Sequence, residues 1–542
     1  MNKDGSNPTI LANPRVSWLT NATNTSISGG NFVSVSMGDM NLGHPITIQR
    51  GMGLPSHSTQ AVNITNRLGL DLLYQHTSPG AVHNSAERYD PPKCLPRTRE
   101  AILQKIMEWV EMRAENMELF IWLYGPAGAG KSAISQTIAE ICEQAGLLAA
   151  SFFFSRTAAG RNDMSRLVLT IVSQLIQTIP EIRDSVLMAL GSDPHIPSST
   201  PASQMKNLVV DSLNKVPPAI LAKRSPLIII DGLDECGNPD SQREILKFLA
   251  SATSKLNAPL LFLIASRPEP DIRLTFNADI LKSITHCIPL PDSSETDRDL
   301  RLFLRTKFQE IVLMHPMRSH IPPNWPSDDE IKVLVLRASG QFIYVSTVMR
   351  FIQSSHHRPQ DRLETILALR PKDNDHEPFA ILDSLYLQIL SSVKKEHLDN
   401  VLDILRCLVF IWGGEINYVS AAPERLEDFL GYRPGDLEIY MADLHALVYL
   451  PPPEKPRDII RIHHASFRDF LVDQARSGEF FLDAPTTHAN LVHRWIPYME
   501  KYRKLEHCTP FKFLYSDILG ELNFVQGTQK KWHCGWMRSF IT

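Results

Sequence analysis

Cysteine is scarce and scattered in this sequence. The 542 residues contain seven cysteines, at positions 94, 142, 236, 287, 407, 508 and 534, and no two of them form a CxxC pair. A disulfide-stabilised secreted domain requires a denser, paired pattern. The scatter is typical of proteins that work in a reducing compartment.

Charge of one sign and long apolar runs are also missing. Fifty-five Lys and Arg residues stand against 59 Asp and Glu residues, a formal charge of −4, without blocks of either sign. The sequence therefore has no electrostatic footprint for nucleic acid or an acidic membrane surface. No apolar stretch reaches the ~18 residues of a membrane helix, and the N-terminus lacks the apolar run of a signal peptide. We expect a cytoplasmic protein with no transmembrane segment and no nucleic-acid partner.

What is present is ordinary globular composition over more than one domain's length. Hydrophobic residues make up 43% and charged residues 21%, which excludes disorder along the whole chain. Residues 1–90, however, are rich in Asn, Ser, Thr, Gly and Pro, and we predict a weakly ordered N-terminal arm there. Within this arm, residues 30–48 alternate loosely between apolar and polar residues, which suits a strand more than a helix. Because an isolated short strand is marginal in water, this piece is either flexible or completed by a partner.

Five nearly continuous apolar runs alternate with helical patterns between residues 91 and 291. They lie at 119–124, 148–154, 227–231, 260–266 and 283–290. Such runs are typical of a parallel sheet covered by helices on both faces. We predict an α/β domain over 91–291, whose first helix has its N-cap at Thr98.

Helical patterns replace the strands after residue 291. They lie at 295–311, 328–339, 342–353, 378–390 and 398–410, with two more at 425–450 and 459–472. The last two flank PPPEKPRD, which predicts a hairpin inside a winged-helix-like unit. We expect an all-α region made of a helical domain (292–395), a winged-helix-like domain (396–487) and a C-terminal helical tail (488–542).

The strongest chemical signal is the sequence GPAGAGKS, which fits the phosphate-binding P-loop pattern between a strand and a helix. Its glycines let the backbone approach phosphate closely, Lys131 reaches the β- and γ-phosphates, and Ser132 offers its hydroxyl to Mg²⁺. The motif predicts a P-loop NTPase domain that binds ATP or ADP, with GTP as an alternative, together with Mg²⁺. The predicted nucleotide-binding residues of the loop are Gly125, Pro126, Ala127, Gly128, Ala129, Gly130, Lys131, Ser132 and Ala133.

Two further segments place charged residues at strand ends. LIIIDGLDEC puts Asp231 at the end of a buried strand, where a Walker-B carboxylate binds Mg²⁺, so Ser132 and Asp231 are the predicted metal residues. Glu235 is predicted to polarise the attacking water, with Asp234 beside the metal. LFLIASRPEP puts Arg267 after the next strand, where it can contact the γ-phosphate. The alternatives are solvated acids after a strand and a surface arginine before a turn.

These blocks together resemble a NACHT domain of the signal-transducing P-loop ATPases that include the NOD-like receptors. The segments at 91–109, 151–156, 338–352, 382–390 and 463–473 resemble fungal NACHT proteins, so the resemblance covers roughly 82–483. It implies a weakly hydrolysing switch that is closed with ADP and assembles into a homo-oligomer with ATP, acting with sensor or effector proteins. The implied setting is fungal non-self recognition or regulated cell death.

The same resemblance assigns further residues. His464 in HASFRDF occupies the position of the family histidine that reaches the ADP β-phosphate, and His463 next to it is the alternative. Arg97–Arg99 lie where the family's lead-in segment contacts adenine or ribose. Two departures stand out: Gly340-Gln341-Phe342 replaces the family's G-x-P segment, which puts base preference in doubt, and no WD40, ankyrin or TPR array follows. Residues 30–48 faintly resemble the family's β-forming death-signalling motifs.

Three other functions compete with the switch. A metabolic P-loop kinase would need an acceptor pocket, for which the leucine-rich helical half offers no cluster of acids and bases. A nucleotide-binding scaffold without turnover fits the motifs equally well. A DNA-binding regulator is disfavoured, because the winged-helix segment ASFRDFLVDQARSGEF balances two arginines with three acids.

Overall fold

The computed structural model describes residues 57–498, except 89, 113–117, 157, 225–226, 291–292, 370–378, 412–421, 452–458, 488–489, 492 and 495–497. All described residues fall in a single unit. The strand prediction at 30–48 and most of the predicted C-terminal tail lie outside them. Within the described part of the chain, no helix is long and apolar enough to cross a membrane.

The first half of the described chain is built on a five-stranded parallel sheet with strand order β2-β3-β4-β1-β5. All five predicted strands are confirmed, and their bounds are β1 Phe120–Tyr124, β2 Leu148–Phe153, β3 Leu227–Asp231, β4 Leu261–Ser266 and β5 Thr285–Pro289. Because β1, β3 and β4 are central strands, apolar residues occupy both of their faces.

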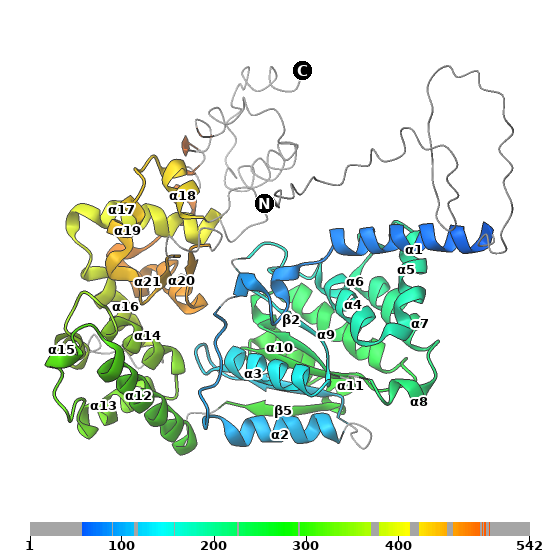
Figure 1. The fold of residues 1–542 in the computed structure, drawn as a ribbon, viewed down its shortest axis with the longest axis horizontal. Helices are drawn as coiled ribbons and strands as arrows, with labels where there is room; N and C mark the ends of the chain where they lie inside the picture. Colours follow the sequence, from blue (N-terminus) through cyan, green and yellow to red (C-terminus); the bar gives the residue numbers. More distant parts are fainter. Residues whose placement is uncertain are drawn as a thin grey trace, which may run out of the picture. The chain divides into compact units, whose positions relative to one another are not determined.

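Helices cover both faces of this sheet (Figure 1). Alternate strand residues such as Ile121, Ile229 and Leu263 pack with α2 and α3, whereas Trp122 and Ile230 pack with α4, α9 and α10 on the other face. The helices of this half are α1 His57–Gln75, α2 Glu100–Glu111, α3 Lys131–Gln144, α4 Leu167–Thr178, α5 Arg183–Ser192, α6 Pro201–Gln204, α7 Asp211–Leu213, α8 Pro218–Leu221, α9 Pro239–Thr253, α10 Pro270–Phe276 and α11 Asp279–Lys282, with a π-helical turn at Met205–Val210.

The prediction of a weakly ordered arm up to residue 90 is wrong for its last part. Helix α1 packs against α5, and the two backbones approach closely at glycines. A Cβ on Gly69 would lie 2.1 Å from the carbonyl oxygen of Leu187, and one on Gly191 would lie 2.2 Å from that of Thr65. Leu73 is fully buried in the core of the α/β domain.

The predicted N-cap of α2 is also wrong. Arg99, with φ 58°, precedes the helix, and the side chain of Thr98 instead donates to the carbonyl oxygen of Leu95 at 2.7 Å. Tertiary contacts fix this backbone conformation. The backbone N–H of Arg99 donates to Asp299 Oδ2 at 2.9 Å, and its guanidinium makes hydrogen bonds of its own.

Helices replace strands after β5, as predicted. They are α12 Ser294–Met314, α13 Asp328–Ala338, α14 Phe342–Ile352, α15 Pro359–Ala368, α16 Ala380–Ser391, α17 Lys395–Arg406 with a π-helical continuation at Cys407–Ile411, α18 Pro423–Leu430, α19 Asp436–Met441, α20 Ala465–Leu471 and α21 Gln474–Ser477. The break at PPPEKPRD joins two short antiparallel strands, β6 Val448–Tyr449 and β7 Arg461–Ile462. The helical patterns predicted at 425–450 and 459–472 are therefore shorter than expected, and each contains a strand.

One hydrophobic core runs through the helical region. Leu304 of α12, Val348 of α14, Leu405 of α17 and Phe470 of α20 belong to the same buried cluster. The boundary that we predict at residue 395 therefore separates two stretches of sequence that share a core.

Candidate functional site

The P-loop connects β1 to α3 at the carboxyl end of the sheet. Gly128 and Gly130 have φ values of 77° and 95°, which side-chain-bearing residues rarely adopt. The N–H groups in the first turn of α3 have no intrahelical partner, so they form an anion-binding end. Lys131 Nζ donates to the carbonyl oxygens of Gly125 and Pro126 at 2.8 and 2.9 Å, which folds its side chain back over the loop. The predicted loop residues thus lie together between β1 and the first turn of α3.

Two distant segments hold the P-loop in this shape. The backbone N–H of Ile343, at the start of α14, donates to the carbonyl oxygen of Gly128 at 3.2 Å, and Ile343 Cγ2 lies 2.1 Å from the position of a Cβ on Gly128. Arg99 donates to the carbonyl oxygen of Ala129 at 3.0 Å, and its guanidinium lies 4.9 Å from the ring centre of Phe342. The lead-in segment and the helical region therefore both contact the phosphate loop directly.

Asp231 ends β3 next to this loop. It lies in register with Ala265 of β4, it is 4% exposed, and burial raises the pKa of its carboxyl group, although Ser132 acts in the opposite direction. Its Oδ1 has no hydrogen-bond partner among the described residues. A buried carboxylate oxygen without a partner, beside a serine hydroxyl, fits the oxygen ligands that Mg²⁺ takes. Asp231 and Ser132 are thus suited to hold the ion, as we predict.

Asp234 and Glu235 lie on the 3-10 turn Leu233–Glu235 after β3, and they have different partners. Asp234 is engaged by Arg267: Oδ1 accepts from its backbone N–H at 2.9 Å, and Oδ2 lies 3.2 Å from its Nε. Glu235 Oε2 accepts from the backbone N–H of Arg156 at 3.1 Å. Burial, followed by the charge of Asp234, raises the pKa of Glu235 to about 7. In this arrangement Asp234 orients Arg267, while Glu235 has the pKa of a general base.

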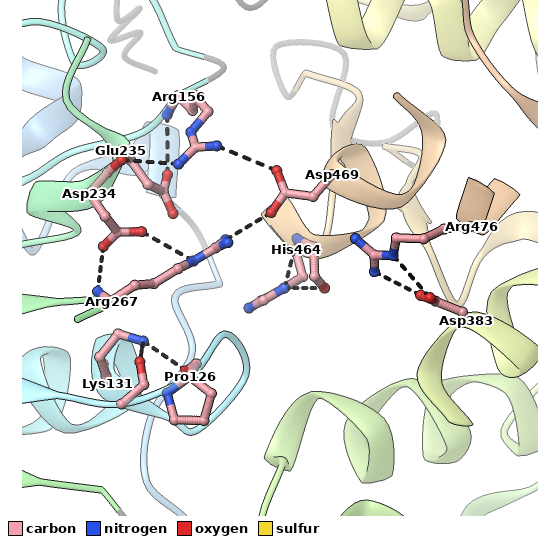
Figure 2. A network of polar contacts seen from close by, with 12 residues as sticks. Pro126, Lys131, Arg156, Asp234, Glu235, Arg267, Asp383, His464, Asp469 and Arg476 are labelled. Atoms are coloured by element: carbon pink, nitrogen blue, oxygen red, sulfur yellow. Dashed lines mark hydrogen bonds and ion pairs between the residues drawn. The ribbon is translucent and has the colours of Figure 1, made fainter. Parts of the chain in front are cut away.

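A carboxylate of α20, that of Asp469, lies beside the arginines that contact this turn. Asp469 Oδ2 lies 3.0 Å from Arg267 Nη2, and Asp469 Oδ1 lies 3.5 Å from Arg156 Nη1 (Figure 2). Arg156 also donates from Nη2 to the carbonyl oxygen of Asp234 at 3.0 Å. The sequence singled out Arg267 for this site but gave no role to Arg156 or Asp469.

His464 is the N-cap of α20, and its Nδ1 accepts from the backbone N–H of Ser466 at 3.1 Å. Burial, followed by the positive charges of Arg267 and Lys131, lowers the pKa of His464 to about 3. His463 points elsewhere, with Nε2 lying 3.2 Å from the carbonyl oxygen of His445. Of the two histidines, His464 is therefore the one on which the charges of Lys131 and Arg267 act.

Two more arginines, which sequence reasoning missed, surround the Walker-B carboxylate. Arg88 donates to Gln136 Oε1 at 2.8 Å and stacks on the ring of Phe153 at 3.5 Å. Burial, followed by the charge of Arg161, lowers the pKa of Arg88 to about 9, and the charge of Asp231 acts in the opposite direction. Arg161 is buried and donates to the carbonyl oxygen of Phe153 at 3.1 Å. Arg88 lies ten residues before Thr98, the predicted N-cap of the first helix, and belongs to no motif, so no signal in the sequence identified it.

A family comparison supports the P-loop half. Residues 97–267 match the family described as Nephrocystin 3, N-terminal. The matched segment begins at the lead-in arginines and ends at Arg267, so it contains the phosphate loop and the first four strands. No curated protein matches the chain.

Among solved structures, the ORC1 protein of Aeropyrum pernix in complex with DNA matches with 13% identity and a TM-score of 0.33, over 70% of this chain and 94% of that one. Cdc6p from Pyrobaculum aerophilum matches with 13% identity and a TM-score of 0.32, over 69% and 93%. A RuvB protein of Thermotoga maritima matches with 13% identity and a TM-score of 0.27, over 68% and 94%. Similarity at this level says nothing about ligands or partners.

The parallel sheet, the strand–loop–helix arrangement of GPAGAGKS and the family match agree with one another. Residues 97–267 therefore have the fold of a P-loop NTPase domain and match the Nephrocystin 3 N-terminal family, and such a fold implies nucleotide binding.

Proposed function

We propose that this chain is a nucleotide-dependent switch of the NACHT class, which is closed with ADP and assembles into a homo-oligomer with ATP. The observation that carries the proposal is that α20 brings Asp469 to Arg156, although 313 positions separate them in the sequence. The same helix has His464 at its N-cap, beside Lys131 and Arg267. A nucleotide in the P-loop would therefore bind two regions of the chain at once, and its phosphates would influence their arrangement.

The phosphate-binding residues have separate roles in this proposal. The first-turn N–H groups of α3 and Lys131 bind the phosphates, and Asp231 with Ser132 holds Mg²⁺. When bound by these residues, the ion would neutralise charge that develops on the phosphate oxygens. Glu235 orients and deprotonates the attacking water. Arg267, held in place by Asp234, stabilises the γ-phosphate.

His464 is proposed to recognise the β-phosphate of ADP. Because its Nδ1 accepts a hydrogen bond from the Ser466 backbone, the neutral ring carries its proton on Nε2. Ser466 Oγ lies 2.7 Å from the same Nδ1 and 2.8 Å from the hydroxyl of Tyr386, which fixes the ring further. The Nε2–H group is then the donor available to a phosphate oxygen.

The cellular role is proposed from the resemblance to NACHT proteins. It is signalling from the cytoplasm, in fungal non-self recognition or regulated cell death, together with sensor or effector proteins. A weak ATPase activity would reset the switch, with GTP as the alternative nucleotide.

The nucleotide that co-purifies with the chain, identified after acid extraction, tests the proposal most directly. We expect ADP in wild-type protein and much less in Lys131→Ala. Light scattering should then show assembly when ADP is replaced by Mg·ATP. A chain that never assembles but phosphorylates a small acceptor would instead be a metabolic kinase. Stable ATP binding without phosphate release or assembly would indicate a scaffold.

A further inference from the structure

Asp469 uses both carboxylate oxygens on two different arginines. Oδ2 lies 3.0 Å from Arg267 Nη2, and Oδ1 lies 3.5 Å from Arg156 Nη1. The side chains of Asp469, Arg267 and Arg156 are 20%, 23% and 31% exposed, so water screens these contacts only partly. The sequence motifs do not account for this bridge.

Both arginines are anchored to the Walker-B turn by their other donors. Arg267 uses its backbone N–H and Nε on Asp234, while Arg156 uses Nη2 on the Asp234 carbonyl oxygen and its backbone N–H on Glu235. Their positions at the carboxyl edge of the sheet therefore do not depend on Asp469. What Asp469 occupies is one outward-facing Nη group of each guanidinium (Figure 2).

These two Nη groups are suited to a phosphate. Guanidinium groups bind phosphate and carboxylate oxygens through the same charge-assisted hydrogen bonds. A γ-phosphate near Lys131 and Arg267 would meet the Asp469 carboxylate, and two anions cannot share the same donors without repulsion. Burial and the charges of Asp234 and Asp469 already raise the pKa of Glu269 beside this group, although Arg156 and Arg267 oppose the shift. Asp469 thus adds one more negative charge to the acids of this group.

We propose that Asp469 determines which nucleotide the closed chain accepts, because its carboxylate takes the position on Arg156 and Arg267 that the γ-phosphate of a nucleoside triphosphate would take. A diphosphate leaves the bridge intact, whereas a triphosphate has to displace it. This inference rests on the proposed function and adds to it the residue that distinguishes ADP from ATP.

Helix α20 links this displacement to the histidine. His464 is its N-cap and Asp469 lies within it, and Phe467 and Phe470 fix the helix to α16, with ring centroids 5.1 and 5.3 Å from that of Tyr386. When Asp469 leaves the arginines, α20 therefore moves together with the helical region on which it packs, and His464 moves with it. His464, which recognises the diphosphate, and Asp469, which rejects the triphosphate, therefore leave the P-loop together.

The test is the ratio of two dissociation constants, measured on the full chain with Mg²⁺ by fluorescence titration. The probes are ADP and the non-hydrolysable analogue adenylyl imidodiphosphate. Asp469→Asn keeps the size of the side chain and removes its charge. We expect its preference for ADP over the analogue to fall at least tenfold, a change of about 1.4 kcal/mol. Asp469→Glu, which keeps the carboxylate, should retain most of the preference.

Asp383→Asn is the matched control. Asp383 forms a comparable carboxylate–guanidinium pair with Arg476, at 2.7 and 2.9 Å, which joins α16 to α21 and touches none of the phosphate-binding residues. Its loss should lower the melting temperature without changing the ratio. If Asp469→Asn changes both affinities equally, or changes the ratio no more than Asp383→Asn does, Asp469 is only a structural ion pair and the inference is wrong. If Asp469→Asn does not fold, Asp469→Ser is measured in the same way.

Failure of the proposed function gives a different result. In that case wild-type protein binds neither probe, or Lys131→Ala binds them as tightly as wild type does. If wild-type protein binds both nucleotides with equal affinity, the P-loop assignment remains and the role of Asp469 is excluded.

Discussion

Replacing Glu235 by glutamine should slow hydrolysis without weakening nucleotide binding. The amide keeps the shape of the side chain, and its oxygen can still accept from the Arg156 backbone, as Oε2 does at 3.1 Å. It cannot take a proton from water. General-base catalysis contributes about 10²–10⁴-fold in enzymes, so a loss of at least a hundredfold in phosphate release is expected. The chain should then accumulate in its ATP-bound, assembled form, because that state no longer decays.

The pH dependence makes this prediction specific to Glu235. Its pKa of about 7 means that about a tenth of the groups are ionised at pH 6 and about nine tenths at pH 8. Phosphate release by wild-type protein should therefore rise about tenfold over this range, whereas the residual rate of Glu235→Gln should not.

Stability offers an independent measurement of the same group. A carboxyl group whose pKa is raised by folding destabilises the folded chain above that pKa and has no effect below its unfolded value of 4.5. The shift corresponds to about 3 kcal/mol at most, and less where water reaches this half-buried side chain. Glu235→Gln should therefore raise the melting temperature at pH 8 and leave it unchanged near pH 4.

The assays are phosphate release and light scattering with Mg·ATP, each recorded from pH 6 to pH 8. Glu244→Gln on α9 is a control for the loss of a carboxylate outside the site. Undiminished turnover in Glu235→Gln, or a flat wild-type profile, would refute the assignment and leave Asp234 as the candidate. Lost turnover without larger particles would indicate an ordinary ATPase.

Three further predictions concern binding. Lys131→Ala should weaken ADP and ATP binding at least tenfold, about 1.4 kcal/mol, in a fluorescence titration; unchanged affinity would contradict the P-loop assignment. His464→Leu removes a proposed donor to a charged phosphate, so ADP affinity should fall roughly tenfold or more and basal self-association should rise; a monomer with wild-type ADP release would point to His463 or to neither histidine. Gly128→Ala would place a Cβ 2.1 Å from Ile343 Cγ2 at a φ of 77°, so it should lower both the melting temperature and ADP affinity. Gly146→Ala, at a φ of 67°, would add a Cβ that has no atom within 4 Å, so it should cost only backbone strain; an equal loss in both variants would disprove a specific packing role.

Strands β1 to β4 were predictable from the sequence because they are buried on both faces. Runs such as LIIID at Leu227–Asp231 have no polar residue until the carboxyl edge, where the sheet ends and ligands bind. The position of Asp231 beside the P-loop follows from parallel strands in register, so that part of the site needed no knowledge of tertiary contacts.

The remainder of the site depends on contacts that no local pattern encodes. Arg156 and Asp469 meet across 313 positions, and each is an ordinary charged residue within its own segment. Arg99 adopts a positive φ because Asp299 and Ala129 hold it, which no capping rule anticipates. Helix α1 escaped prediction because it packs directly on the backbone of α5, through close approaches at Gly69 and Gly191 that no local pattern encodes.

In the proposed switch, Asp234 and Glu235, the two acids of the turn Leu233–Glu235, have different roles. Asp234 holds Arg267, and Arg267 holds Asp469, so the Asp234 carboxylate supports both the γ-phosphate site and the bridge to α20. Removing the Asp234 carboxylate would release Arg267 from both the γ-phosphate site and the bridge. A loss of turnover in such a variant could therefore not be assigned to the chemical step alone. Glu235 contacts only the Arg156 backbone in this network. Its replacement therefore changes the proton-transfer step while the bridge stays in place. A Glu235 variant is thus a switch that cannot reset, whereas an Asp234 variant would also be a switch that cannot close.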